Sequence, residues 1–276
     1  MPTTLAVRTR PGLDVPVAAS TAVAPLLRRP AAGTVLARFP AAVYVRLDSG
    51  PVLALVTSDG LRLPCALVVA ATSAERPFST TGATTAVVDG ALVLDDVRYR
   101  PVRTWTPRER TAGRLQPAAV AELAALLGLS PHSRQVDDRL RAGTTRLAAA
   151  LRTGDGLAAA ADALVGLGPG LTPAGDDVLA GVLVTCAQLG HPQPALVSGV
   201  RRRAGATTAL SADLLRHAGA GRAAPPVLGL LDALVGARPV APALADLLAV
   251  GSTSGHDTAT GVLLAAQALI DRGAGA

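Results

Sequence analysis

The chain carries the stretch GLGPGLTPAGDDVLAG at residues 166–181, where a glycine-rich loop leads into an apolar helix. Glycines at three of five consecutive positions let the backbone turn sharply and approach a ligand closely. The N–H groups at the start of a helix are free to bind, with the positive end of the helix dipole behind them, and many phosphate sites are built in this way. The stretch therefore predicts a ligand site at this helix start.

Two aspartates at the same helix start, Asp176 and Asp177, would repel a bare anion. In one interpretation, Asp176 caps the helix and Asp177 supports its first turn, which together contribute about 1 kcal/mol. In the other, a carboxylate binds Mg²⁺, which then bridges to a phosphate, or it accepts hydrogen bonds from a substrate amide. The residues of this stretch leave both interpretations open.

A second helix start, GSTSGHDTATG at residues 251–261, repeats the spacing of the first. In both, a hydroxyl-bearing loop precedes a glycine, an aspartate follows two residues later, and a further glycine, Gly181 or Gly261, lies one turn into the helix. A glycine in a helix interior costs about 1 kcal/mol relative to alanine, so the pattern predicts close packing at these two points. If the two helices pack against each other, Asp177 and Asp257 flank one cleft. Chance recurrence in a chain rich in glycine and alanine is the alternative.

A third segment, TTALSADLLRH at residues 207–217, adds candidate polar groups. Ser211 has the residue type of a helix N-cap, and that alone would explain it. Thr208 and Arg216 could instead line the same cleft as the aspartates. His256, next to the second aspartate, is a candidate general base. A solvent-facing histidine in the first helical turn is the simpler interpretation.

The composition is that of a folded protein without a membrane span. Half of the 276 residues are hydrophobic and 17% are charged, and the mean hydropathy of +0.40 reflects abundant alanine, valine and leucine. The best apolar stretch, Val178–Leu189, is interrupted and falls short of the roughly 20 residues that cross a bilayer. Prolines break the N-terminal segment, which makes it a poor signal peptide. We therefore expect a cytoplasmic protein with no membrane partner.

The positive charge is carried by arginine alone, because the chain contains no lysine. This excludes Schiff-base chemistry and phosphate loops that depend on a lysine. The net charge is +6, but only 2% of the residues are aromatic, whereas nucleic-acid binding favours basic groups interleaved with stacking aromatics. We expect no nucleic-acid partner and interpret Arg201–Arg203 as a solvated helix face or a patch for an acidic partner. Cys65 and Cys186 have no partner at metal-ligand spacing and are expected to be buried free thiols.

The hydrophobic pattern changes along the chain and predicts a β-rich N-terminal part, residues 1–110, and a helical C-terminal part, residues 111–276. Alternating β-branched segments predict strands, and Asp-Gly at 89–90 predicts a two-residue hairpin turn. Alanine- and leucine-rich segments with helical spacing follow, punctuated by proline and glycine. The fold class predicted is α+β. The strands are predicted at Val43–Leu47, Val52–Val56, Leu61–Val69, Val87–Leu94 and Arg98–Trp105. The helices that carry the motifs are predicted at Asp177–Leu189, Ser211–Ala218 and Asp257–Ile270.

Three segments together resemble the AllH-like family: residues 166–181, Thr-Thr-x-Leu-Ser at 207–211, and Gly-His-Asp-Thr-x-x-Gly at 255–261. They occur in the family's order, and the β-rich beginning followed by helices is similar as well, so the resemblance covers most of the chain. Where the family more often has serine this chain has Ala174, and a hydroxyl contact would be missing there.

This resemblance implies a subunit of oxamate carbamoyltransferase. That enzyme transfers a carbamoyl group between oxalurate and phosphate, giving oxamate and carbamoyl phosphate in allantoin (purine nitrogen) catabolism. A small-molecule substrate and other carbamoyltransferase subunits are the implied partners, and a homo-oligomer is a further option.

The resemblance also implies roles for the residues in these segments. Glycine-rich N–H groups would hold phosphate, an arginine would hold the oxamate carboxylate, and the aspartates would bind the carbamoyl amide or Mg²⁺, the one candidate cofactor. The candidate catalytic residues are Asp177, Asp257 and His256, and the candidate metal ligands are Asp176, Asp177 and Asp257. The candidate substrate-binding residues are Gly168, Gly170, Thr172, Gly175, Asp176, Thr208, Ser211, Arg216, Ser254 and Gly255.

Two other functions remain as alternatives at this stage. The segment starting at Gly255 is similar to the Asp-rich helix start of ADP-ribosylglycohydrolases, which are all-helical magnesium-dependent hydrolases. Their acidic triplet is incomplete here, because Ala259 stands where a second aspartate would follow Asp257, and a β-rich N-terminal part does not fit them. The other alternative is a non-catalytic binding or scaffold subunit, in which the glycine motifs only pack helices together.

Overall fold

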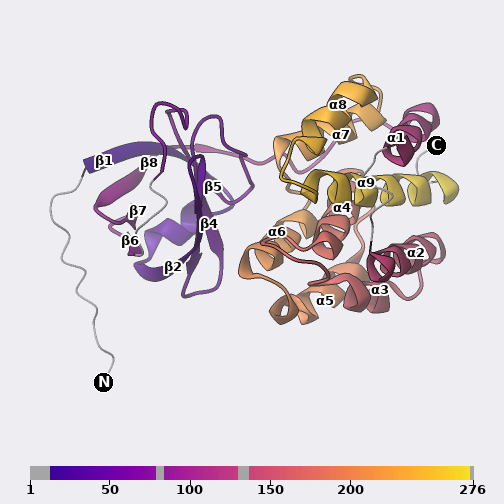
Figure 1. Cartoon of the computed structure of the whole chain (residues 1–276), viewed down its shortest axis with the longest axis horizontal. Coiled ribbons are helices and arrows are strands. Elements are labelled where there is room, and N and C mark those ends of the chain that lie inside the picture. The colour runs from indigo at the N-terminus through magenta and orange to yellow at the C-terminus, as the bar shows by residue number, and fades with distance from the viewer. Residues whose placement is uncertain (1–12, 79–83, 130–136, 274–276) are drawn as a thin grey trace. The chain divides into compact units, whose positions relative to one another are not determined.

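The computed structural model describes residues 13–78, 84–129 and 137–273. The chain divides into two compact units, Met1–Thr106 and Pro107–Ala276, which are described separately here. The first unit is built from strands and the second from helices (Figure 1). The α+β fold class predicted from the sequence is confirmed.

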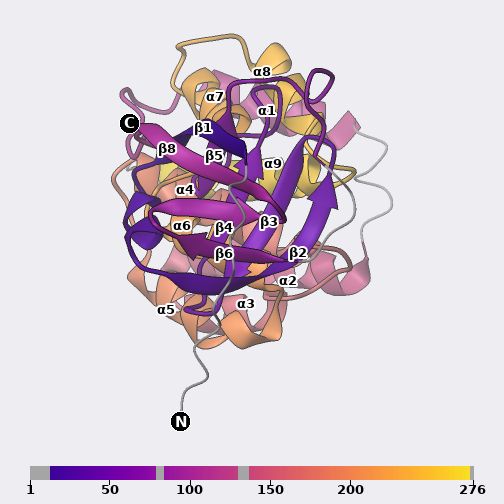
Figure 2. The same cartoon turned by 90° about the vertical axis from the view of Figure 1, so that its left-hand side faces the viewer.

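The first unit is a closed barrel (Figure 2). Around the barrel, neighbouring strands are hydrogen-bonded in the order β1-β5-β4-β3-β2-β6-β7-β8. The pairs β1–β8 and β4–β5 are parallel, and the other neighbouring pairs are antiparallel. A short 3₁₀ helix, Ala24–Arg28, follows the first strand. The strands are β1 (Leu13–Ser20), β2 (Ala31–Phe39), β3 (Ala42–Leu47), β4 (Val52–Val56), β5 (Ala66–Val69), β6 (Thr85–Val88), β7 (Ala91–Leu94) and β8 (Val97–Trp105).

Local sequence patterns account for most of these strands. In β3 the buried Val43 and Val45 are followed by the exposed Arg46, the alternation of a half-buried strand. The turn between β6 and β7 has positive φ at both Asp89 (48°) and Gly90 (78°), as the predicted two-residue hairpin requires.

One strand prediction needs correction, and the strands β1 and β2 were not predicted from the sequence. The strand expected over Leu61–Val69 begins only at Ala66, because the preceding residues form turns closed by short-range backbone hydrogen bonds. The strand β1 was not predicted, because Pro16 interrupts its pattern. Pro16 precedes the β1–β5 ladder, which begins at Val17, but it lies within the parallel β1–β8 register, opposite Arg100.

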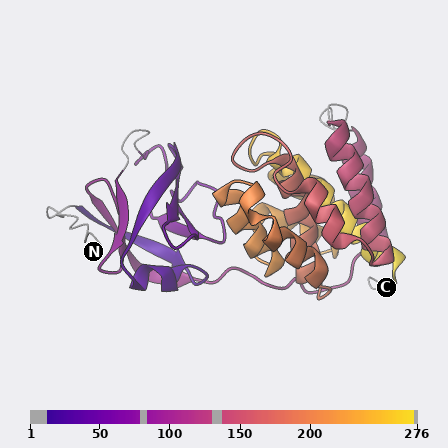
Figure 3. The ribbon, with the colours of Figure 1, turned by 90° about the horizontal axis from the view of Figure 1, so that it is seen from below.

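The second unit is a bundle of helices around one hydrophobic core (Figure 3). No helix in the described part of the chain is both long and apolar enough to cross a membrane. The α-helices are α1 (Pro117–Leu129), α2 (Asp138–Thr153), α3 (Leu157–Leu164), α4 (Ala174–Gln188), α5 (Pro194–Arg202), α6 (Ala209–Gly219), α7 (Pro225–Leu234), α8 (Val240–Leu248) and α9 (Ser254–Asp271).

Helices α4 and α9 are the centre of this unit, and they make the most extensive contact between any two described elements. Both begin three residues before the predicted start, at Ala174 and Ser254. In α4 the reason is that the carbonyl of Pro173 already accepts hydrogen bonds from the N–H groups of Asp176 and Asp177. The helical turn therefore closes before the apolar pattern begins.

The two helices cross at the glycines that repeat in the sequence. A Cβ atom added to Gly261 would lie 2.0 Å from the carbonyl oxygen of Val178, and one added to Gly181 would lie 2.2 Å from that of Thr258. The prediction that α4 and α9 pack against each other at these glycines is confirmed. Since each aspartate lies one turn before its glycine, this crossing fixes the spacing of the two helix starts.

Candidate functional site

The loop before α4 and the first turn of α9 meet through two hydroxyl groups. Thr172 Oγ1 and Ser254 Oγ lie 2.9 Å apart, within hydrogen-bonding distance. Both hydroxyls also act on Asp177, the fourth residue of α4, by hydrogen bonding. Asp257 is the fourth residue of α9, and its charge acts on Asp177 as well. The structure thus brings two of the candidate catalytic residues and two of the candidate substrate-binding residues together.

Asp177 is a buried acid whose pKa is strongly raised. Its side chain is 8% exposed, and within the described residues its Oδ2 atom has no hydrogen-bond partner. Burial raises the pKa of Asp177 from 3.8 to about 8, with the charges of Asp257 and Asp176 adding to the rise and the hydroxyls of Ser254 and Thr172 opposing it. A carboxyl with this pKa keeps its proton near neutral pH, so it can donate as well as accept a hydrogen bond.

The stability of the fold is expected to fall with rising pH because of Asp177. Its pKa is higher in the folded chain than the ordinary value of 3.8, so the folded state binds more protons between about pH 4 and pH 8. The stabilisation is complete below that window and is lost as pH rises through the folded pKa. Asp177→Asn keeps the shape of the side chain but cannot ionise, so its stability should depend less on pH than that of the wild type. Melting temperatures measured from about pH 5 to about pH 9 should fall by several degrees more in the wild type. Parallel profiles would show that Asp177 does not titrate in this way.

Asp176 holds three segments of the helical unit together. Its carboxylate accepts hydrogen bonds from Gly166 N at 2.9 Å, from Ser211 Oγ at 2.8 Å and from Thr207 Oγ1. The interpretation of Asp176 as the helix cap is wrong, since Pro173 takes the N-cap position of α4 without a side-chain bond. Asp176 instead fixes the glycine-rich loop and the start of α6 to α4.

Asp176 differs from the other two candidate metal ligands, Asp177 and Asp257. Asp176 is already engaged by three donors, and its set with Asp177 and Asp257 is not among the groups in the described residues that converge closely enough to hold one ion. Asp177 and Asp257 remain as two carboxylates that could take part in binding a cation.

The start of α6 is tied to the glycine-rich loop through Thr208. Its Oγ1 accepts a hydrogen bond from Ser211 N at 3.0 Å and donates one to the carbonyl of Leu171. Thr208 is therefore the N-cap of α6, and the prediction of Ser211 as the N-cap is wrong. The helix begins two residues before Ser211, whose own hydroxyl is used by Asp176.

The candidate glycines are required for two different reasons, close packing at some positions and a positive φ angle at others. A Cβ atom on Gly175 would lie 2.1 Å from the last carbonyl oxygen of α3, and one on Gly255 would lie 2.0 Å from a carbonyl oxygen in α8. Both allow close packing of the helix starts. Gly168 and Gly170 are exposed in the loop with φ of 115° and 93°, a region that favours glycine.

The backbone donors at the start of α4 are used within the protein. The N–H of Gly175 donates to the carbonyl of Leu167 at 2.9 Å. Those of Asp176 and Asp177 donate to the carbonyl of Pro173 at 2.9 and 3.1 Å. A phosphate at this helix start would not find these three N–H groups available.

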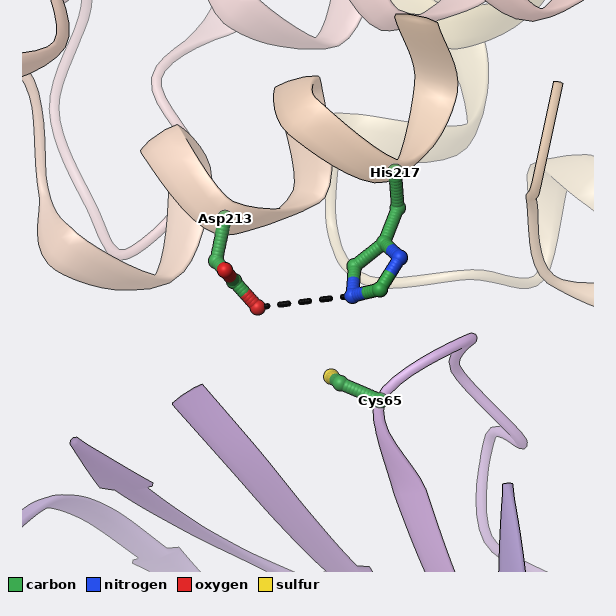
Figure 4. Close-up of side chains that lie close together, drawn as sticks. All are labelled: Cys65, Asp213 and His217. Atoms are coloured by element: carbon green, nitrogen blue, oxygen red, sulfur yellow. Dashed lines mark ion pairs between the residues drawn. The ribbon is translucent and has the colours of Figure 1, made fainter. Parts of the chain in front are cut away.

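Arg216, the candidate ligand for a carboxylate, is paired with Asp213 on the same helix. Its Nε and Nη2 donate to Asp213 Oδ1 at 3.0 and 2.7 Å, and His217 Nε2 lies 3.5 Å from Asp213 Oδ2 (Figure 4). Burial acts to raise the pKa of Asp213, but hydrogen bonds from His217 and Arg216 outweigh it and hold the pKa below its ordinary value. Sequence reasoning missed this group, although the i, i+3 and i, i+4 spacing on one helix could have indicated it.

His256 is buried, with 8% of its surface exposed, so the interpretation as a solvent-facing histidine is wrong. The first turn of α9 packs against the end of α8 at Gly255, which places the following residue inside the unit. The backbone carbonyl of His256 also accepts a hydrogen bond from Thr260 Oγ1. His256 therefore belongs to the buried start of α9, together with Asp257.

Comparison with known proteins bears on this part of the chain. Residues 164–266 match the family model described as oxamate carbamoyltransferase subunit AllH. The match begins at the end of α3 and includes the starts of α4, α6 and α9, where the polar groups above lie. It confirms the resemblance inferred from the three sequence motifs. No solved structure matches the chain significantly.

Proposed function

From the AllH family match we propose that this chain is a subunit of a carbamoyltransferase that acts on oxamate or oxalurate and carbamoyl phosphate in allantoin (purine nitrogen) catabolism. We place it in the cytoplasm, in a complex with other carbamoyltransferase subunits. The observation that carries the proposal is the buried carboxyl of Asp177, which lies beside Asp257 at a helix start inside the matched region.

The proposed reaction needs one proton transfer at the oxamate nitrogen. This nitrogen attacks the carbamoyl carbon, a C–N bond forms, and the bond between that carbon and the phosphate oxygen breaks. Phosphate leaves with the electron pair, and the nitrogen gives up one proton. In the reverse direction phosphate attacks the carbamoyl group of oxalurate, and the departing oxamate nitrogen regains a proton.

We assign that proton transfer to Asp177 and Asp257. An acid whose pKa lies near the working pH is the most effective general acid or base, and burial brings the pKa of Asp177 to about 8. Asp257 supplies a neighbouring negative charge, and the Thr172 and Ser254 hydroxyls are placed to orient the ligand. Burial also keeps water from carbamoyl phosphate, which limits its hydrolysis.

The remaining candidate residues receive supporting roles in the proposal. Asp176, Thr208 and Ser211 fix the loop and helix starts around the reacting groups. His256 is held in the same turn of α9 as Asp257. If Mg²⁺ takes part, Asp177 and Asp257 are the residues that would hold it.

Formation of carbamoyl phosphate tests the proposed function. The chain, purified with the subunits that accompany it in its native cells, should convert oxalurate and phosphate into oxamate and carbamoyl phosphate. Asp257→Asn in this chain should lower the rate by about 100-fold or more, within the range of general acid–base catalysis. The matched control Asp162→Asn, on the exposed side of α3, should leave the rate unchanged.

Two results would contradict the proposal. One is an absence of phosphate-dependent product from the assembled subunits. The other is hydrolysis by this chain alone with Mg²⁺, which would favour the ADP-ribosylglycohydrolase-like alternative. A scaffold subunit would leave the rate of the complex unchanged in Asp257→Asn.

A further inference from the structure

The two carboxyls at the α4–α9 crossing, Asp177 and Asp257, are called the acid pair below. We infer that the acid pair binds the N–H-bearing amide or ureido end of the ligand and rejects an anionic group at the same position. This inference rests on the proposed function for the identity of the ligand, and it assigns the phosphate or carboxylate end to a place outside the α4 helix start.

The first observation is an unused acceptor in a buried position. Asp177 is more than nine-tenths buried, and its Oδ2 atom has no hydrogen-bond partner within the described residues. Buried polar atoms are nearly always hydrogen-bonded, so an unpaired one at a helix start indicates a group that arrives from outside. Thr172, Ser254 and Asp257 act on the same carboxyl and are the described groups that such a ligand would meet there.

The second observation is the sign of the charge. The groups that act on Asp177 are two hydroxyls and two further acids, Asp257 and Asp176, with no basic side chain among them. A phosphate or carboxylate oxygen placed here would meet like charge in a buried setting, where charges are poorly screened. An uncharged amide meets no such repulsion.

The third observation concerns the backbone donors. The N–H groups that normally bind an anion at a helix start are here used by the protein, since Gly175 donates to Leu167, and Asp176 and Asp177 donate to Pro173. In α9 the N–H of Asp257 likewise donates within its own chain. What remains at Asp177 is the Oδ2 acceptor, together with the two hydroxyls that act on this carboxyl.

A primary amide is complementary to this set. The Oδ2 atom of Asp177, which has no hydrogen-bond partner within the described residues, can accept a hydrogen bond from one amide N–H. The second amide N–H is then available to the Asp257 carboxylate, and the Thr172 and Ser254 hydroxyls can complete the contacts.

Oxamate and oxalate test this inference directly, because they have the same shape and differ in one group, an NH₂ in oxamate and an O⁻ in oxalate. Calorimetric titration of the full chain near pH 7 should give at least about tenfold tighter binding of oxamate. Asp257→Asn retains an acceptor for the amide but removes the negative charge. This variant should bind oxamate within a few fold of the wild type, and its preference over oxalate should fall by about tenfold.

Three outcomes would overturn the inference: equal or tighter binding of oxalate by the wild type, an unchanged preference in Asp257→Asn, or no binding of oxamate. A melting curve for Asp257→Asn controls for folding. Failure of the proposed function has a different signature, in which the preference for oxamate is present but no phosphate-dependent carbamoyl phosphate forms. Formation of carbamoyl phosphate without tighter binding of oxamate than of oxalate would contradict the role of the acid pair but not the proposed function.

Discussion

Gly261→Ala is expected to lower the free energy of unfolding by about 3 kcal/mol or more. The added Cβ atom would lie 2.0 Å from Val178 O and 3.0 Å from Val182 N, and both are backbone atoms of α4 that cannot rotate away. The helices α4 and α9 would have to separate along their whole contact. For a unit of this size, the melting temperature should fall by about 10 °C, measured by circular dichroism.

Gly128→Ala is the matched control for this effect. Gly128 is an exposed glycine within α1, and an added Cβ atom would meet nothing within 4 Å. Alanine has the higher helix propensity, so this variant should be unchanged or more stable by up to about 1 kcal/mol. If both variants behaved alike, the glycines at the α4–α9 crossing would not be set by close packing.

Asp177→Ala is expected to weaken the binding of carbamoyl phosphate by about 100-fold. The variant loses two hydrogen bonds to the ligand in a buried place, together about 3 kcal/mol. Folding should be little affected, because Oδ2 of Asp177 has no partner within the described residues, and the Thr172 and Ser254 hydroxyls that lose an acceptor can still hydrogen-bond to each other. The melting temperature should stay within a few degrees of the wild-type value, whereas a support of the helix start alone would lower it.

The helix crossing could be predicted from the sequence because it depends on local chemistry. A glycine inside an apolar helix is costly unless another backbone needs the space, and two such glycines at equal distances from two aspartates indicated one shared contact. The β6–β7 hairpin was predictable for the same reason, since Asp89 and Gly90 alone satisfy its turn. Closure of the barrel was not predictable, because the pairing of β1 with β8 joins residues far apart in the chain.

The errors at the site have a common physical cause. Asp176 follows the rule for a helix cap, but its donors Gly166, Thr207 and Ser211 come from segments 10 to 35 residues away. These long-range hydrogen bonds determine the role of Asp176, and the sequence next to Asp176 does not reveal them. The hydroxyl of Ser211 donates its hydrogen bond to Asp176, and Thr208 is the N-cap of α6 instead.

We expect a carbamoyl ligand to bind at Asp177, between the starts of α4 and α9. Calorimetric titration of carbamoyl phosphate into the wild type, Asp177→Ala and the surface control Asp162→Ala tests it most directly. We expect saturable binding to the wild type and the control, and a loss of affinity of about 100-fold in Asp177→Ala with a melting temperature within a few degrees of the wild-type value. Equal affinity in all three proteins, or no binding to the wild type, would contradict it.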